Sequence, residues 1–118
     1  MYAISKEFSF CASHQLNGLP ANHLCSHIHG HNYVVIAELK TDFVDATGFV
    51  VDYRKLDSIK NYLDSKFDHR HLNDVIEFNP TAENLAAHLF CMFKKTFPML
   101  SAITVKETDK TMARYDLS

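Results

Sequence analysis

The chain has 118 residues, which is enough for one domain with a substantial hydrophobic core. Its formal net charge is -2 and it contains no basic run, which argues against nucleic-acid binding through a cationic face. Its apolar stretches are shorter than the ~18 residues that span a bilayer, and its first residues alternate like a strand rather than a signal peptide. We therefore expect one domain over 1–118, located in the cytoplasm, with neither nucleic acid nor membrane as a partner.

The first predicted element is a strand at 8–14, because apolar side chains occupy alternate positions there. The members of this face are Phe8, Phe10, Ala12 and His14. A loop with Gly, Pro and Asn follows at 17–22. A second strand is expected at 29–39, where the same alternation places His29 and His31 on one face.

The next stretch predicts a turn, a short strand and a helix. The sequence DATG at 45–48 is typical of a turn, and FVV at 49–51 predicts a short strand after it. Asp52 is a suitable cap for a helix whose apolar residues recur at helical spacing. These residues are Leu56, Ile59, Leu63 and Phe67.

A second helix is predicted at the sequence NPTAEN, with Pro80 near its first turn and Asn79 or Thr81 as its cap. Its apolar face consists of Leu85, Leu89, Phe93 and Phe97. We expect this helix to end at Pro98. The segments LSAITVKE and MARYDLS predict two further strands, which gives the order ββααββ. This order predicts an α+β fold in which a four-stranded antiparallel sheet carries two helices on one face.

Eight histidines are many for a chain of this size. His29 and His31 project from the same face of a strand, roughly 7 Å apart. Antiparallel pairing of the first two strands would bring His14 beside them, and three neutral imidazoles with an open fourth position are typical of a catalytic zinc site. The alternative is a histidine-rich loop beside an ordinary strand. The position of His14 on an apolar face disfavours that alternative, because an unpartnered imidazole is costly there.

The three cysteines are widely spaced and no secretion signal precedes them, which predicts free thiols. Cys25 lies four residues before His29, where a nearby cation would favour its thiolate, so it is a candidate base or nucleophile. A closed structural zinc site with Cys25 and His29 is an alternative, but no C-x-x-C pair accompanies them. Cys11 and Cys91 are predicted to be packing residues.

The motifs FSFCASHQL, CSHIHGHNY, FDHRHLND, NPTAENLA and VKET occur in this order, and on them the chain resembles the 6-pyruvoyl-tetrahydropterin synthase family. The resemblance covers nearly the whole chain and implies a tunnelling fold (T-fold), in which several subunits join their sheets into a barrel, commonly as a hexamer. It looks closest to the bacterial branch of queuosine biosynthesis. The implied reaction converts 7,8-dihydroneopterin triphosphate to 6-carboxytetrahydropterin with loss of acetaldehyde and triphosphate.

The resemblance also implies a role for each matched residue. The implied zinc ligands are His14, His29 and His31. Cys25 would remove a proton from the substrate, and the Asp68–His69 pair would return protons. Glu107 would accept two hydrogen bonds from the pterin. Without the resemblance, Asp68 and His69 would be interpreted as a capped turn and Glu107 as an exposed carboxylate at a strand end.

Other functions stay open at this point. A member of the same family could instead make 6-pyruvoyl-tetrahydropterin or cleave dihydroneopterin like an aldolase, although Cys25 before the HGH sequence favours a synthase. A protein of a different class would bind zinc or a pterin without catalysis, and would not need Cys25 or the Asp68–His69 pair. Arg70 and His71 could contact the triphosphate, and His71 places a second imidazole near the proton relay.

Overall fold

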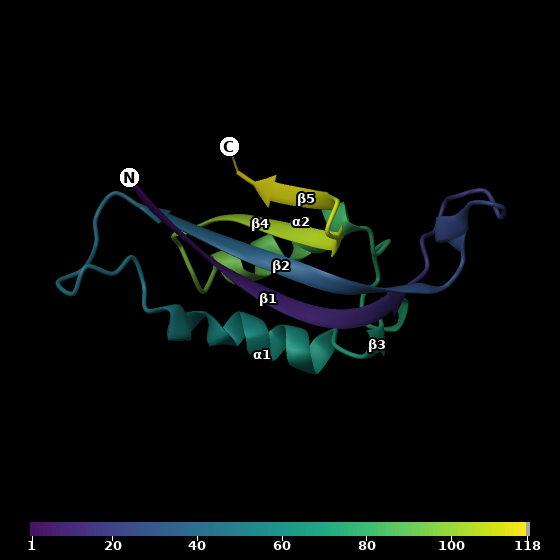
Figure 1. Cartoon of the computed structure of the whole chain (residues 1–118), viewed down its shortest axis with the longest axis horizontal. Helices are drawn as coiled ribbons and strands as arrows, with labels where there is room; N and C mark the ends of the chain where they lie inside the picture. The colour runs from purple at the N-terminus through teal and green to yellow at the C-terminus, as the bar shows by residue number, and fades with distance from the viewer. Residues whose placement is uncertain (118) are drawn as a thin grey trace.

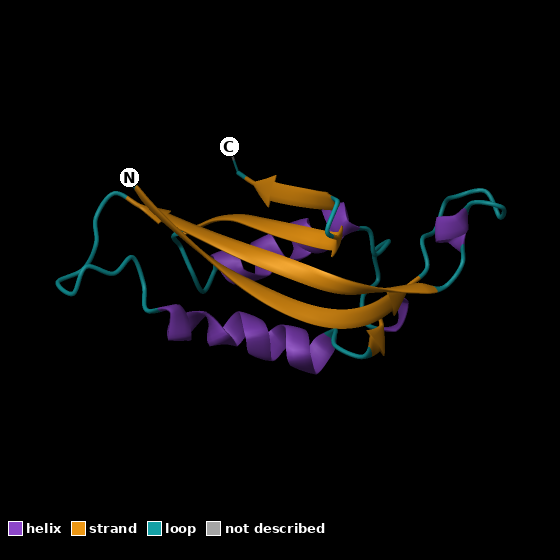
Figure 2. Ribbon diagram, in the orientation of Figure 1, coloured by secondary structure: helices purple, strands orange, loops and turns teal. Residues whose placement is uncertain are grey.

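The computed structural model of the protein describes residues 1–117 as one sheet with two α-helices on one of its faces (Figures 1 and 2). The strands are β1 (Tyr2–His14), β2 (His29–Thr41), β3 (Arg70–His71), β4 (Leu100–Thr108) and β5 (Thr111–Asp116). Their order in the sheet is β3-β1-β2-β4-β5. All neighbours are antiparallel except β3, which pairs in parallel with β1. The predicted α+β fold and its four antiparallel strands are confirmed, and β3 adds a fifth strand at the edge.

The central pair of strands sets the register of the site. β1 and β2 each have 13 residues and pair along their whole length, with His14 opposite His29. The even positions of β1 and the odd positions of β2 therefore share one face, as predicted. On that face Phe10 stacks on Tyr33 with ring centroids 4.7 Å apart. One face of each strand is thus buried under the helices. This burial fixes the register, because a shift by one residue would turn the apolar side chains of that strand toward solvent.

The first helix begins where the sequence predicts it. The carboxylate of Asp52 accepts a hydrogen bond from the backbone N–H of Arg54 and starts a 3-10 turn, η2 (Tyr53–Leu56), which leads directly into α1 (Asp57–Lys66). The apolar residues at helical spacing are fully buried: Leu56, Ile59, Leu63 and Phe67. Burial of each of these side chains contributes about 1.5–3 kcal/mol, so this face holds the helix against the sheet.

Thr81 is the cap of the second helix, since its hydroxyl accepts a hydrogen bond from the N–H of Asn84 at 3.1 Å. α2 (Ala82–Lys94) packs against β4 and β5. It ends before the predicted stop at Pro98, whose carbonyl oxygen accepts a hydrogen bond from the ammonium of Lys94. Among residues 1–117, no helix is long and apolar enough to cross a bilayer.

Two local predictions are wrong. Residues 49–51 form no strand, because the preceding turn pairs its own backbone groups: the N–H of Asp45 donates to the carbonyl of Phe49 at 2.9 Å. Cys11 and Cys91 are exposed rather than packed in the core. Cys11 lies on the strand face away from the helices, and Cys91 lies outside the apolar stripe of α2.

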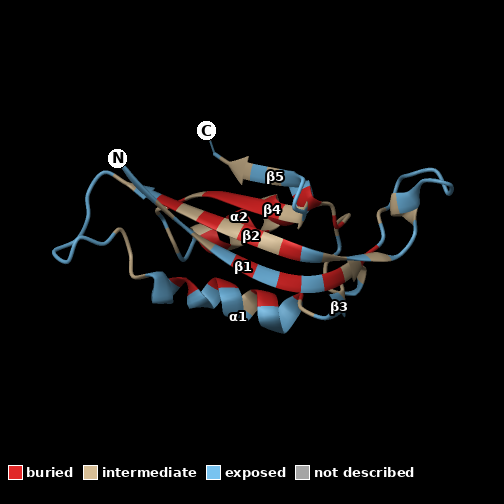
Figure 3. Ribbon diagram, in the orientation of Figure 1, coloured by how far each residue is buried: buried red, intermediate tan, exposed pale blue. Residues whose placement is uncertain are grey.

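Within residues 1–117, the face of the sheet opposite the helices carries no helix of its own (Figures 1 and 3). The buried positions in Figure 3 lie mostly on the strands and on the helix sides that face them. β5 forms one edge of the sheet. At the other edge, β3 pairs only with Ala12 and Ser13, so most of β1 has an open side within the described residues. Open strand edges are suited to pairing with another chain.

Candidate metal centre and active site

The structure brings the three predicted metal ligands together at one end of the sheet. His14 pairs with His29, and Ala12 pairs with His31, so the three rings lie on one face of two adjacent strands. The distances between ring centroids are 4.4, 4.9 and 5.0 Å. The carboxylate of Glu107 reaches the same place from β4. The possible ligand atoms of the four residues lie within 4.8 Å of one another, and we call them the metal group.

Hydrogen bonds to backbone carbonyls determine which ring nitrogen of His14 and of His29 faces the metal group. Nδ1 of His14 lies 2.7 Å from the carbonyl oxygen of Pro80, and Nδ1 of His29 lies 2.8 Å from that of His27. Because a carbonyl can only accept, each Nδ1 carries the proton and each Nε2 presents a lone pair. The two Nε2 atoms are 2.8 Å apart. Two lone pairs so close repel unless a cation binds both, so these bonds favour a metal at Nε2.

The third imidazole provides a second observation in favour of a metal. Nε2 of His31 is buried and forms no hydrogen bond, although it lies 3.0 Å from Oε2 of Glu107. The two atoms are close enough for an ion pair, but their angles do not fit a hydrogen bond. A buried polar atom without a partner costs about 1–3 kcal/mol, which a metal ion would offset by taking the lone pair. The metal group therefore could bind a cation that prefers nitrogen and oxygen ligands.

Burial favours the neutral form of two of these rings, those of His14 and His31. His14 has no exposed surface, and its burial lowers its pKa, an effect that the Pro80 carbonyl opposes. Burial also lowers the pKa of His31, while the Glu107 carboxylate acts in the opposite direction. Tyr33, whose hydroxyl lies 3.1 Å from Nδ1 of His14, has its pKa raised by burial and stays protonated. Neutral imidazole is the form that ligates metal, so these rings are suited to binding one near neutral pH.

Cys25 is not part of the metal group. It lies in a 3-10 turn, η1 (Leu24–Ser26), within the loop at 15–28 that projects beyond the ends of β1 and β2 (Figure 1). Its N–H donates to Nδ1 of His23 at 3.0 Å, and its carbonyl accepts from the N–H of Leu16 at 3.0 Å. These bonds fold the loop on itself and leave the thiol partly buried. The role of Cys25 as a base stays a prediction.

Asp68 and His69 lie between α1 and β3, at the edge of the sheet. Oδ1 of Asp68 accepts from the N–H of Cys11 at 2.9 Å, and the N–H of His69 donates to the carbonyl of Cys11 at 2.6 Å. These bonds hold His69 at a φ of 58°, a positive value that no other non-glycine residue of 1–117 adopts. Such strained conformations occur often at functional sites.

The Asp68–His69 pair is turned outward and does not touch the metal group. The side chain of His69 is 82% exposed. Its Nε2 lies 3.6 Å from Oδ2 of Asp68, which is within ion-pair distance but too long for a hydrogen bond. The exposed imidazole is therefore accessible to another molecule, and its catalytic role stays a prediction.

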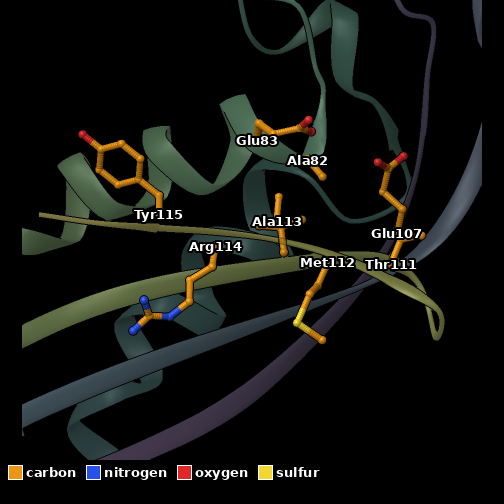
Figure 4. Close-up of a pocket in the computed structure, with 9 residues that line it drawn as sticks. Ala82, Glu83, Glu107, Thr111, Met112, Ala113, Arg114 and Tyr115 are labelled. Atoms are coloured by element: carbon orange, nitrogen blue, oxygen red, sulfur yellow. The ribbon is translucent and has the colours of Figure 1, made fainter. Parts of the chain in front are cut away.

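A cavity of about 490 Å³ lies beside the metal group, between the β4–β5 hairpin and the start of α2. Figure 4 shows Glu107 and Glu83 with their carboxylates on the same side of the hairpin, near Ala82. Val105 and Ala113 add apolar surface. Cavities of about 300–1,000 Å³ are usual for small-molecule sites. Because Glu107 belongs both to the metal group and to this cavity, the two form one candidate active site.

Some features of the site escape prediction from the sequence. From the sequence, Glu107 is expected to contact only the substrate. In the structure its carboxylate lies close enough to the three imidazoles to share a metal ion with them. The β2–β4 register contains the signal, since Val35 pairs with Val105 and Glu107 follows two residues later on the same face. The carbonyl groups of Pro80 and His27 have no such signal, because any residue type supplies a backbone carbonyl.

Comparisons with known proteins agree with this geometry. Residues 3–118 match the family described as 6-pyruvoyl tetrahydropterin synthase. A Synechocystis protein named 6-carboxy-5,6,7,8-tetrahydropterin synthase is 37% identical over 127 residues, covering 98% of this chain and 93% of that protein. A protein of the same name from Haemophilus influenzae is 32% identical over 111 residues, covering 91% of this chain and 76% of that protein.

The fold leads to the same family. The structure of 6-pyruvoyl tetrahydropterin synthase from Caenorhabditis elegans matches this chain with a TM-score of 0.86 and 28% identity, covering 99% of this chain and 96% of that one. The sheet and its two helices are therefore a T-fold. Since both sequence and fold match over nearly the entire length, the chain belongs to the 6-pyruvoyl tetrahydropterin synthase family.

Proposed function

We propose that this protein is a zinc-dependent 6-carboxy-5,6,7,8-tetrahydropterin synthase that acts in queuosine biosynthesis in the cytoplasm. It would convert 7,8-dihydroneopterin triphosphate and one water molecule to 6-carboxytetrahydropterin, acetaldehyde and triphosphate. The observation that carries this proposal is the metal group, whose Glu107 also lines a cavity of about 490 Å³. The name of the Synechocystis relative, at 37% identity, supports this choice of product.

Zinc fits the metal group because three neutral imidazoles with one further position are its usual catalytic ligand set. Bound there, zinc would act as a Lewis acid toward the hydroxyl groups of the substrate side chain. His14, His29 and His31 would hold it, the first two oriented by their Nδ1 bonds to backbone carbonyls. Glu107 lines the cavity as well, and its carboxylate would accept hydrogen bonds from N3–H and the amino group of the pterin.

Proton transfer is assigned to Cys25 and to the Asp68–His69 pair. The thiolate of Cys25 would take a proton from the substrate side chain. The imidazole of His69 would return a proton, and Asp68 would orient the ring. In one chain, Cys25 lies on the projecting loop and His69 at the sheet edge.

A neighbouring copy would then complete the site. The open edges of β1 and β5 support a homo-oligomer in which sheets join edge to edge, and the exposed ring of His69 would meet a second chain there. We propose a hexamer, the assembly that the resemblance to this family implies.

One other activity has a specific observation in its favour. The structural match to the Caenorhabditis elegans enzyme, whose name gives 6-pyruvoyl tetrahydropterin as its product, favours a synthase that forms that compound. The same metal ligands and proton-transfer residues would serve it. The two activities differ in their products, because only the carboxy product is accompanied by acetaldehyde.

Zinc-dependent turnover tests the proposal. Protein stripped with a chelator is incubated with 7,8-dihydroneopterin triphosphate and increasing zinc, and released triphosphate and acetaldehyde are measured. Turnover should return at about one zinc per chain. His29→Ala should stay inactive, while the matched control His27→Ala, which keeps its backbone carbonyl, should behave like the wild type. Turnover that does not depend on zinc, or none in the zinc-loaded wild type, would contradict the proposal.

A further inference from the structure

Two asparagine side chains bind the start of the loop at 15–28 by the same pattern of hydrogen bonds. Oδ1 of Asn73 accepts from the N–H of Gln15 at 2.8 Å, and Nδ2 of Asn73 donates to the carbonyl oxygen of Gln15 at 2.8 Å. Asn79 binds the backbone of Asn17 in the same way, at 2.8 and 3.2 Å. Each carboxamide thus pairs with both backbone groups of one residue, as a neighbouring strand would.

These bonds continue the edge of β1 beyond the point where backbone pairing stops. Ser13 is the last residue of β1 that pairs with β3. The chain after β3 then forms a 3-10 turn, η3 (Leu72–Asp74), whose backbone is no longer extended and cannot serve as a strand. The side chains of Asn73 and Asn79 take over the pairing from there.

The residues that the asparagines bind also hold the turn that carries Cys25. The N–H of Leu16 donates to the carbonyl oxygen of Cys25 at 3.0 Å. The side-chain amide of Gln15 donates to the carbonyl oxygen of Ser26 at 2.7 Å. The two asparagines therefore act on the position of Cys25 through one short segment, residues 15–17.

Packing does not hold this loop in place. The structure describes the loop at 15–28 completely, and no residue in it is buried. Segments with few buried apolar contacts open easily. Gln15 and Asn17 are exposed, so water can replace the carboxamides at their backbone groups. The bonds to the asparagines therefore determine where the loop lies more than they stabilise the fold.

Asn79 also connects the loop to the metal group. The carbonyl oxygen of the next residue, Pro80, lies 2.7 Å from Nδ1 of His14. The carbonyl oxygen of Asn79 itself accepts from the N–H of Thr81 and from Nδ2 of Asn84, both at 2.9 Å, which fixes it at the start of α2. The same short segment thus orients a predicted metal ligand and holds the loop that carries the predicted base.

We propose, resting on the assignment of Cys25 as the base in the proposed function, that Asn73 and Asn79 are positioning residues for its thiol. Their carboxamides hold the loop so that Cys25 reaches a substrate bound at the metal group. They contact neither the metal nor the substrate, so both should still bind when a carboxamide is removed. A catalytic group displaced by about 1 Å can lose about a hundredfold in rate, so the loss should appear in kcat.

Turnover and hydrogen exchange of zinc-loaded Asn73→Ala and Asn79→Ala test the inference. Expressed per bound zinc, so that unfolded protein does not count, kcat should fall about tenfold or more, while KM and zinc content change less than about twofold. The amide hydrogens of the loop should exchange about tenfold faster, because each variant lacks two hydrogen bonds that close it. Asn73→Asp and Asn79→Asp keep the shape and the bond to the backbone N–H, so both effects should be smaller but measurable.

The matched control is Asn84→Ala, which removes one side-chain hydrogen bond from the carbonyl oxygen of Asn79 without touching residues 15–17. It should match the wild type in kcat and in loop exchange. The inference is overturned, while the proposed function stands, if the alanine variants keep the wild-type kcat, if kcat falls without faster loop exchange, or if Asn84→Ala loses as much. Where an alanine variant does not fold, a wild-type kcat in its aspartate counterpart overturns it. If zinc-loaded wild type does not turn over 7,8-dihydroneopterin triphosphate, the proposed function fails and the inference with it.

Discussion

Replacing His31 with Ala should remove most of the stabilisation that zinc gives this protein, and the substitution should cost little stability when zinc is absent. Nε2 of His31 is buried without a hydrogen bond, beside the carboxylate of Glu107. In the metal-free protein this atom is an unsatisfied polar group, so removing it relieves a cost while the ring's packing against Tyr33 is lost. In the zinc-loaded protein the same nitrogen is a ligand. The effect of the substitution should therefore depend strongly on zinc.

The size of this effect follows from mass action. Free zinc at a hundred times its dissociation constant stabilises the folded chain by about 2.7 kcal/mol. For a chain of 118 residues, 1 kcal/mol corresponds to about 3–5 °C in Tm, so zinc should raise the Tm of the wild type by about 8–13 °C. If the loss of one imidazole weakens zinc binding about a hundredfold, His31→Ala gains only about 0.4 kcal/mol at the same zinc concentration. That gain corresponds to about 1–2 °C.

Thermal unfolding of both proteins, with chelator and with buffered zinc, measures the difference. His27→Ala is the control, because its exposed ring lies near the metal group but only its backbone carbonyl is used. It should show the full zinc-dependent shift. An equal shift in wild type and His31→Ala would refute the assignment of His31 as a ligand. A wild type whose Tm does not respond to zinc would refute the metal site as a whole.

Three further predictions concern the thiol, the partly buried His88 and the assembly. Cys25→Ala should keep its fold and its zinc but lose at least a hundredfold in turnover, whereas Cys11→Ala and Cys91→Ala should stay active; a fully active Cys25→Ala enzyme would exclude Cys25 as the base. Burial lowers the pKa of His88 below 6.5, so the unfolded chain binds a proton that the folded chain excludes as pH falls below 6.5. Urea unfolding should therefore show the wild type losing stability more steeply than His88→Gln below pH 6.5, and equal slopes would contradict this. Mixed and reassembled Cys25→Ala and His69→Ala chains should recover part of the activity, and inactive hetero-oligomers would show that each chain builds its own site.

The parts of the fold that the sequence predicts are those in which one face of an element is buried. Alternation at Phe8, Phe10 and His14 identifies the core face of β1, because the residues between them face away from the helices. The face of α2 that contains Leu85 and Leu89 is predicted by the same reasoning at helical spacing. β3 has only two residues, which is too short for any period to be recognised. Pairing with β1, distant in the sequence, is what makes it a strand.

The candidate site divides in a similar way. His29 and His31 are predicted together because the period of one strand places them on one face. Glu107 joins the metal group only through the register between β2 and β4. These strands are far apart in the sequence, and no local pattern predicts how they align.

The identity of the product tests the central claim most directly. Zinc-loaded wild-type protein is incubated with 7,8-dihydroneopterin triphosphate, and the products are separated by chromatography and identified by mass spectrometry. We expect 6-carboxytetrahydropterin, with acetaldehyde and triphosphate formed in equal amounts. Accumulation of 6-pyruvoyl-tetrahydropterin without acetaldehyde, or recovery of unchanged substrate, would contradict the claim.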